Sequence, residues 1–134
     1  MLGISSKMTK RLHTGSVLKI IDNSGAIKAR IIGIKRYGGV KNRYPRGGIA
    51  DIAICSVIAG KPEIKHTVVP VVIVQQRGAF RRPDGTRIIF ENNAGVVLKD
   101  VKEAEPKGSI VKEPVAKEVI ERFIKIGKIT KVVV

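Results

Sequence analysis

The sequence predicts a mainly β fold, a small closed or nearly closed barrel followed by a short helical extension. The aliphatic residues comprise 20 Ile and 17 Val but only 4 Leu, and side chains branched at Cβ pack well on a pleated sheet. Short apolar segments alternate with Gly, Pro, Asn and Asp along most of the chain. With 43% hydrophobic residues in 134 positions, the chain can bury a core and has the length of one domain.

Six strands are expected, and turn-forming residues separate them. They cover residues 16–21, 27–34, 49–58, 68–74, 87–91 and 95–99. The connections at 22–25, 37–48, 83–85 and 91–94 contain Gly, Asn or Asp, which accept the positive φ that tight turns require. Pro70 cannot donate a backbone hydrogen bond, so the fourth strand is expected to have an edge or a bulge there. Because no long helix interrupts these segments, they fit a small barrel.

The last third of the chain predicts one amphipathic helix. Residues 99–113 are polar and fit a loop, and Pro114 suits the first helical position. Gly127 fits a left-handed C-terminal stop, and the apolar tail 129–134 is expected to dock as a strand or short turn. The helix, of about three turns, has an apolar face that packs on the barrel or binds a partner. Its two i,i+4 rows are Val115, Val119, Phe123 and Ala116, Ile120, Ile124.

The positive charge is concentrated in the expected barrel. We expect a single domain over residues 1–134, with a basic N-terminal extension at 1–15, the barrel at 16–99 and a C-terminal loop, helix and tail at 100–134. The formal net charge is +15, and residues 1–98 carry +12 of it. A compact and strongly cationic protein attracts polyanions.

The segment between Asp22 and Asp51 contains no acidic residue, although its loop at 36–48 is strongly basic. Glycines let this loop follow a curved phosphate backbone, arginine binds phosphate bidentately, and Tyr37 and Tyr44 can stack on exposed bases. An ordinary solvated hairpin is the alternative, but such one-sided charge is costly unless a polyanion neutralises it. The cations of the segment are Lys28, Arg30, Lys35, Arg36, Lys41, Arg43 and Arg46.

A second basic cluster occupies residues 77–87. The turn at 83–85 would present Arg81, Arg82 and Arg87 on one side of a hairpin, while Asp84 shapes the turn rather than contacting a ligand. Two basic hairpins on one small barrel suit the binding of folded RNA by shape and backbone contacts better than the reading of a base sequence.

The residues that usually carry catalysis or hold a metal do not form a recognisable site. His13 and His66 lack a nearby Cys, Ser or acidic partner at a familiar spacing. Cys55 is the only cysteine, which excludes an internal disulfide and a cysteine zinc cluster, and its apolar neighbours predict a buried thiol. The glycine pairs at 38–39 and 47–48 match no phosphate-binding or dinucleotide motif. We therefore expect no enzyme activity, no cofactor and no metal.

Three motifs resemble the family of universal large-subunit ribosomal protein fourteen. They are Asp-Asn-Ser-Gly-Ala at 22–26, Gly-Ala-Phe-Arg-Arg-Pro-Asp-Gly-Thr-Arg-Ile-Ile-Phe-Glu-Asn-Asn-Ala-Gly-Val-Val-Leu at 78–98, and Pro-Val-Ala-Lys-Glu at 114–118. They follow the order and spacing of the family, and the middle block is its most specific signature. The resemblance covers residues 12–126, and the segments 1–14, 41–46 and 60–63 resemble archaeal members, with the eukaryotic form next.

The resemblance implies a five-stranded β-barrel and a structural protein of the large ribosomal subunit that binds its RNA. It implies a position on the face toward the small subunit, with an intersubunit bridge to small-subunit RNA. It also implies contacts with neighbouring ribosomal proteins, including universal large-subunit protein three, and docking of the anti-association initiation factor six on the C-terminal region. The expected location is cytoplasmic, in the ribosome.

Carried onto this chain, the resemblance places ribosomal RNA at the two basic segments. The helix at 114–123 would face the subunit interface or the factor, through Lys117, Glu118, Glu121 and Arg122, whose mixed charges predict a solvated face. The expected RNA-binding residues are Lys28, Arg30, Lys35, Arg36, Lys41, Asn42, Arg43, Tyr44, Arg46, Arg77, Arg81, Arg82 and Arg87.

Two positions depart from the pattern of the family. Glu113 stands where a Gly usually precedes Pro-Val-Ala, so a side chain and a charge replace a permissive backbone in the preceding loop. Asn92 stands where an Asp is usual, and it can still form an Asx-type turn.

The alternative function is a free-standing RNA-binding β-barrel that acts as a transient translation or RNA-chaperone factor. Such a factor would need a stacking platform, and the few aromatic residues, 4% of the chain, offer a poor one. Adhesion to an anionic membrane is disfavoured because the helix lacks a Lys/Arg-rich face opposite its apolar one. The longest charge-free apolar stretches are also far shorter than the about 20 residues of a membrane span, and no export signal is recognised.

Overall fold

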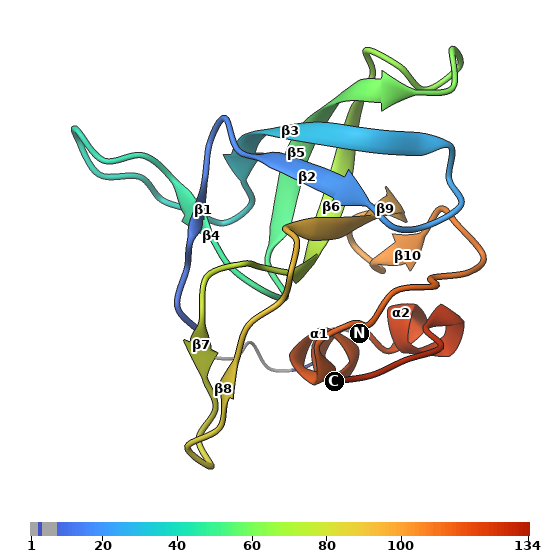
Figure 1. Cartoon of the computed structure of the whole chain (residues 1–134). Helices are drawn as coiled ribbons and strands as arrows, with labels where there is room; N and C mark the ends of the chain where they lie inside the picture. The colour runs from blue at the N-terminus through green and yellow to red at the C-terminus, as the bar shows by residue number, and fades with distance from the viewer. Residues whose placement is uncertain (1–2, 4–7) are drawn as a thin grey trace.

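Five strands close into a barrel in the computed structural model, which describes residue 3 and residues 8–134 (Figure 1). Each strand pairs antiparallel with the next, and the last pairs parallel with the first, with Lys19 opposite Ala94. Closure leaves no long unpaired strand edge, and the predicted fold class is confirmed. The barrel strands are β2 (Val17–Ile20), β3 (Ala26–Ile34), β5 (Ile52–Gly60), β6 (Val68–Gln75) and β9 (Ala94–Asp100).

The predicted barrel strands are correct to within three residues at each end. Pro70 lies opposite Ile54 of β5, whereas the ladder on the other side of β6 begins one residue later, with Val71 opposite Val97. Pro70 therefore occupies a local edge, as predicted, and removes no hydrogen bond from the β6–β9 ladder. Of the predicted N-terminal extension, residues 1–2 and 4–7 lie outside the described residues.

Two short strand pairings were not expected from the sequence: β1 (Leu12–His13) pairs with β4 (Arg46–Gly47), and β10 (Glu105–Pro106) pairs with β9. β7 (Phe80–Arg81) pairs with β8 (Arg87–Ile88) in the hairpin that was expected within residues 77–87.

The strand predicted at 87–91 is wrong in extent, because only its first two residues are a strand, in a hairpin outside the barrel. The backbone leaves the hairpin ladder before Phe90, whose amide donates to the carbonyl of Gln76 at 3.3 Å. The Phe90 ring then packs 6.3 Å, between centroids, from the ring of Phe80.

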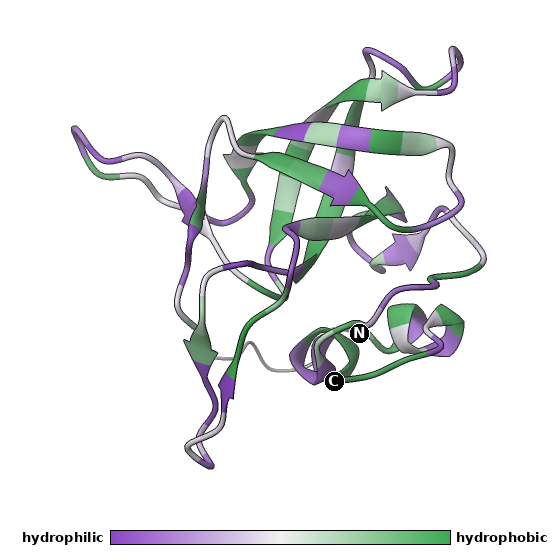
Figure 2. Ribbon diagram, in the orientation of Figure 1, coloured by the Kyte–Doolittle hydropathy of each residue, from purple (hydrophilic) through white to green (hydrophobic). Residues whose placement is uncertain are grey.

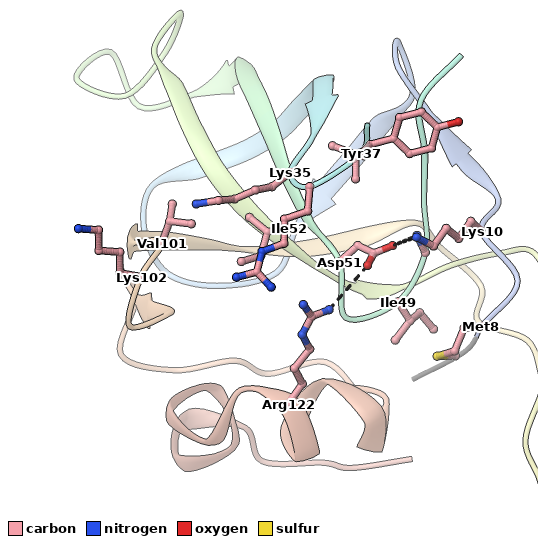
Figure 3. Close-up of a pocket in the computed structure, with 13 residues that line it drawn as sticks. Met8, Lys10, Lys35, Tyr37, Ile49, Asp51, Ile52, Val101, Lys102 and Arg122 are labelled. Atoms are coloured by element: carbon pink, nitrogen blue, oxygen red, sulfur yellow. Dashed lines mark hydrogen bonds and ion pairs between the residues drawn. The ribbon is translucent and has the colours of Figure 1, made fainter. Parts of the chain in front are cut away.

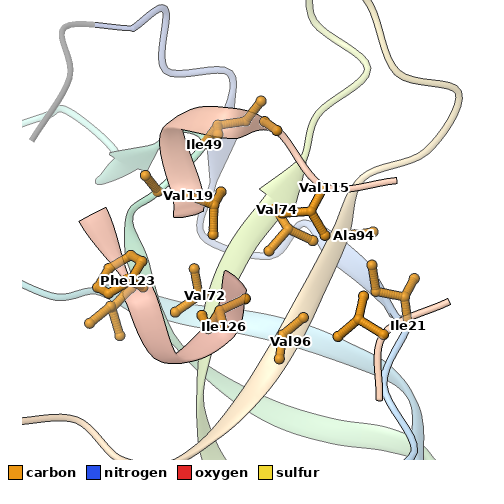
Figure 4. Close-up of a cluster of buried hydrophobic side chains, with 14 of the residues drawn as sticks. Ile21, Ile49, Val72, Val74, Ala94, Val96, Val115, Val119, Phe123 and Ile126 are labelled. Carbon is orange, nitrogen blue, oxygen red and sulfur yellow. The ribbon is translucent and has the colours of Figure 1, made fainter. Parts of the chain in front are cut away.

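The core has two layers, one inside the barrel and one between the barrel and the C-terminal segment. Side chains alternate along β6, so that Val71 and Ile73 belong to the inner layer while Val72 and Val74 belong to the outer one. Figure 2 shows hydrophobic residues along these strands and hydrophilic ones toward the projecting loops. The outer layer includes Ile21, Ile49, Val72, Val74, Ala94, Val96, Val115, Val119, Phe123 and Ile126 (Figure 4).

Cys55 lies in the inner layer and is fully buried, as the sequence predicts. Burial raises the pKa of its thiol to about 12, because a thiolate would lose its hydration there. The thiol is therefore a small apolar core group.

The C-terminal segment forms two short helices instead of the single predicted one. α1 covers Lys117–Arg122 and α2 covers Ile124–Ile129, and Phe123 between them has φ −121° and ψ 85°, outside helical geometry. Gly127 lies inside α2 and does not end a helix. A Cβ at this position would lie 2.7 Å from Cγ2 of Ile120, so the glycine allows α2 to approach α1 closely.

The apolar side chains of α1 and of the residues on either side of it pack on the barrel, so the predicted apolar rows belong to the core rather than to a partner-binding face. Val115, Val119 and Phe123 are buried in the outer layer of the core. Ile124, by contrast, is 63% exposed, because the chain turns into α2 at this point and the i,i+4 row is broken.

The C-terminal tail docks against the segment that precedes α1, as predicted. Val133 forms a parallel bridge with Val115, and the amide of Lys117 donates to the carbonyl of Val134 at 3.0 Å. Pro114 consequently precedes the helix and does not begin it. Among residues 8–134, no helix has the length and apolar character needed to cross a bilayer.

Candidate nucleic-acid interface

The long loop between β3 and β4 projects away from the barrel (Figure 1). At its tip the amide of Arg43 donates to the carbonyl of Val40 at 3.1 Å, and Asn42 has a positive φ of 62°. Asparagine tolerates this conformation better than most residues. At its base, Arg46 lies opposite His13 in the β1–β4 pair. The loop therefore combines a fixed base with a projecting tip.

The predicted contacts of this loop all lie on the surface, and Lys41, Asn42, Arg43 and Arg46 are exposed. Tyr44 is 74% exposed, and its ring centroid lies 6.0 Å from that of His13. A large ring held in this position is available to stack on an unpaired base.

The β7–β8 hairpin carries the second basic cluster and projects from the side of the barrel where β1 and β4 lie (Figure 1). Arg81 and Arg87 are exposed and lie opposite each other in its ladder. Like charges at such positions destabilise a strand pair, so an anion bound between them would stabilise the hairpin. Asp84 accepts a hydrogen bond from the amide of Thr86 at 2.9 Å, which lowers the pKa of Asp84. Asp84 thus shapes the turn, as predicted.

Arg82 differs from the other predicted RNA contacts. Its Nε donates to Oε1 of Glu118 at 2.7 Å, and its Nη2 donates to the carbonyl of Val134 at 2.7 Å. The Arg82 and Glu118 side chains are only 10% and 8% exposed, and the guanidinium carbon lies 5.8 Å from the centroid of the Phe80 ring. The expectation that the hairpin presents Arg82 to a ligand is therefore corrected, since this side chain ties the hairpin to α1 and the C-terminus.

The outer face of the barrel adds a third cationic area. Lys28 lies opposite Lys19 in the β2–β3 ladder, and the amide of Arg77 donates to Oδ1 of Asn93 at 2.9 Å. These four residues line a shallow hollow of about 220 Å³ together with Val17 and Asn92. Lys19 and Asn93 are not among the residues expected from the sequence, although alternation along β2 puts Lys19 on the outer face.

Within the described residues, most of the predicted RNA-binding cations have no acidic partner. In the part of the chain that the structure describes, the cations that lie within 4.0 Å of an acidic group are Lys10, Lys19, Arg82, Arg122 and Lys125. The remaining predicted cations are exposed and unpaired there, so their charge is left for a polyanion to neutralise. They are Lys28, Arg30, Lys35, Arg36, Lys41, Arg43, Arg46, Arg77, Arg81 and Arg87.

The predicted solvated face of α1 is only half correct. Lys117 and Glu121 are exposed, but Glu118 is buried against Arg82. Arg122 is 13% exposed, and its Nη1 donates to the carbonyl of Ala50 at 2.8 Å. Glu118 and Arg122 are therefore structural residues, and Lys117 and Glu121 are left as candidate contacts.

The two departures from the family pattern have different consequences. Glu113 forms an ion pair with Lys19 of β2 and so fastens the loop before α1 to the outer face of the barrel. At the other position, Asn92 is exposed, and Oδ1 of its neighbour Asn93 accepts a hydrogen bond from the amide of Arg77.

The chain is similar to ribosomal proteins over its whole length. The model of the family described as Ribosomal protein L14p/L23e matches residues 11–134. Large ribosomal subunit protein uL14 of Methanocella arvoryzae is 42% identical over 134 residues, which is 100% of both chains, and the protein of the same name from Methanothrix thermoacetophila is 43% identical with the same coverage. The uL14 protein of Nanoarchaeum equitans is 44% identical over 131 residues, 98% of each chain.

These relatives are archaeal, as the resemblance of the shorter segments predicts. Their shared name also favours a constituent of the large subunit over the alternative of a transient factor. With the match extending from the N-terminal strand through both C-terminal helices, the chain belongs to the ribosomal protein L14p/L23e family.

Proposed function

We propose that this protein is a structural component of the large ribosomal subunit and that it binds the subunit's RNA through three surfaces. These are the loop at 36–46, the β7–β8 hairpin and the outer face of β2 and β3. The observation that carries the proposal is the set of exposed cations without acidic partners within the described residues. RNA phosphates provide the missing negative charge, and the release of their counterions supplies binding free energy.

The shape of the surface suits recognition of folded RNA better than recognition of a particular base sequence. Phosphate contacts fix the position and orientation of a protein on RNA but carry no sequence information. The barrel holds the two projecting segments in place, while their tips can follow the curvature of a folded strand. Tyr44 adds a ring that can stack on one unpaired base.

The salt dependence of binding to purified large-subunit RNA tests this function. Replacing Arg43 and Arg46 with alanine should weaken binding and reduce the slope of log K against log salt by about 1.8, which is two phosphate contacts. The matched control replaces Lys65 and Lys128, two exposed lysines outside the three surfaces, and should change the slope less. An unchanged slope for the arginine variant would remove the loop from the interface.

We further infer that the C-terminal part faces the small subunit. Lys117 and Glu121 are exposed on α1, and Ile124 and the tail residues Val132 and Val133 leave apolar surface beside them. A mixed polar and apolar surface of this kind suits contacts with RNA and protein together. By family resemblance the partners are small-subunit RNA, universal large-subunit protein three and the anti-association initiation factor six, in the cytoplasmic ribosome.

Exchanging the two exposed charges of α1 tests this second surface. The double variant Lys117→Glu, Glu121→Lys keeps the net charge and changes no residue of the loop or the hairpin. Subunit joining or factor docking should be impaired, while binding to large-subunit RNA stays unchanged. Equal loss of both activities would contradict the separate roles of the two surfaces.

A further inference from the structure

A cationic pocket lies between the open end of the barrel and α1 (Figure 3). Its volume of about 430 Å³ falls within the range of about 300–1,000 Å³ that is usual for sites of small molecules and cofactors. Lys35 and Tyr37 reach it from the chain after β3, Lys102 from the segment after β9, and Arg122 from α1. Segments far apart in the sequence thus place positive charge around one cavity.

The pocket carries more positive charge than its own acid can neutralise. Asp51 is the acidic residue that lines it, and this carboxylate is already shared between Lys10 at 3.5 Å and Arg122 at 3.7 Å. Among the described residues, three further cations of the pocket have no acidic group within 4.0 Å. They are Lys35, Arg36 and Lys102.

Two details of the backbone and side chains favour an anionic occupant. The guanidinium of Arg122 points from α1 toward the pocket (Figure 3) and adds to the positive charge that lines it. Arg36 has a φ of 65°, a strained conformation for a residue with a side chain, and such strain gathers at binding sites.

We propose that this pocket binds one nucleotide of the ribosomal RNA. Lys35, Arg36 and Lys102 hold its phosphate, and its base lies at the rim beside Tyr37. The proposal rests on the RNA binding proposed above and extends it inward from the loop. RNA is favoured over an acidic peptide because Arg36 and Tyr37 belong both to the pocket and to the base of that loop. Single bases turned out of RNA commonly stack on aromatic side chains.

A mononucleotide is the first probe, because it is too small to bridge the loop and the hairpin. Adenosine monophosphate added to the full-length protein should shift the NMR signals of Tyr37 and Val101, which line the pocket. The variant Lys35→Ala, Lys102→Ala should weaken this binding at least about tenfold. The matched variant Lys65→Ala, Lys128→Ala removes the same charge outside the pocket and should stay within about twofold.

Two results of this titration would overturn the proposal. Equal weakening in both double variants would mean that only overall charge matters. Inorganic phosphate binding as tightly as the nucleotide would mean that the base contributes nothing. Thermal unfolding of each variant checks that the fold is retained.

Photo-crosslinking in the assembled large subunit distinguishes RNA from protein as the occupant. Benzoylphenylalanine placed at position 101, on the pocket wall, should crosslink to a single nucleotide of the ribosomal RNA. A crosslink to another ribosomal protein, or no crosslink, would contradict the proposal.

The proposal for the pocket and the proposal for the wider RNA-binding surface can be refuted separately. If the Arg43, Arg46 variant loses RNA affinity but the Lys35, Lys102 variant binds the mononucleotide normally, the proposed function stands and the pocket is refuted. If the Arg43, Arg46 variant binds RNA with an unchanged slope, the failure lies in the proposed function.

Discussion

Replacing Arg82 with methionine should destabilise the protein far more than the same change at the neighbouring Arg81. The Arg82–Glu118 pair is bidentate, with 2.7 Å from Nε to Oε1 and 3.3 Å from Nη2 to Oε2, and its side chains are only 10% and 8% exposed. Methionine keeps an apolar stem but leaves the Glu118 carboxylate buried without a cation and the Val134 carbonyl without this donor. Removing one partner of a buried pair costs about 3–5 kcal/mol.

The control and the double variant separate the ion pair from general effects. Arg81→Met changes an exposed side chain and should alter the free energy of unfolding by no more than about 0.5 kcal/mol. The double variant Arg82→Met, Glu118→Leu replaces both charges by apolar groups, which is often neutral or stabilising. It should therefore recover most of the loss. The single variant Glu118→Leu completes the double-mutant cycle; it leaves Arg82 without its carboxylate and should also destabilise the protein, so the coupling energy should exceed about 3 kcal/mol.

Urea unfolding of the wild-type protein and these four variants, followed by circular dichroism, measures these free energies. A loss of about 3 kcal/mol should also lower the Tm by roughly 10 °C in a chain of this size. If Arg82→Met is as stable as Arg81→Met, or if the double variant loses the sum of the single losses, the pair does not hold the hairpin to α1.

Three further predictions concern the two layers of the core. Phe123→Ala should cost about 3–5 kcal/mol in urea unfolding, because the ring is 1% exposed in the outer layer; near-neutral stability would mean that the C-terminal segment does not share the barrel's core. Cys55, whose pKa is raised from 9.0 to about 12 by burial, should resist a thiolate-specific reagent at pH 8 until the protein unfolds, and rapid labelling of the folded protein would contradict its burial. Above pH 9 the unfolded chain loses the thiol proton while the folded protein keeps it, so the stability contributed by Cys55 should fall as the pH rises from 9 toward 12.

The barrel could be predicted because its signals are local and repeated. Branched side chains and turn residues mark each barrel strand, and Pro70 marks a local edge. Strands of two residues, such as Leu12–His13 and Phe80–Arg81, are too short to show a period of two. The end of the first helix at Phe123 could not be predicted either, because the apolar i,i+4 rows continue in the sequence beyond this residue. The chain turns there, and the ring of Phe123 stays in the core.

The sequence predicted the candidate site correctly only for cations that have no acidic partner among the described residues of the folded protein and therefore stay exposed. The unpaired cations of the loop, such as Arg43 and Arg46, were expected on the surface because the segment between Asp22 and Asp51 contains no acidic residue. The structure shows that both side chains are exposed. Arg82 and Glu118 are separated by 36 positions, so no local pattern reveals their pairing. Glu118 also lies among other charged residues of α1, and this local pattern resembles a solvated face.

Directed hydroxyl-radical probing in the assembled large subunit tests the central claim, that the projecting basic segments lie against ribosomal RNA. An iron chelate would be attached to a cysteine introduced by Asn42→Cys at the tip of the loop or by Thr86→Cys near the tip of the hairpin, both exposed positions. The native Cys55 is buried, so the unsubstituted protein serves as the unlabelled control. We predict cleavage of large-subunit RNA from both positions, and the absence of RNA cleavage from both would contradict the claim.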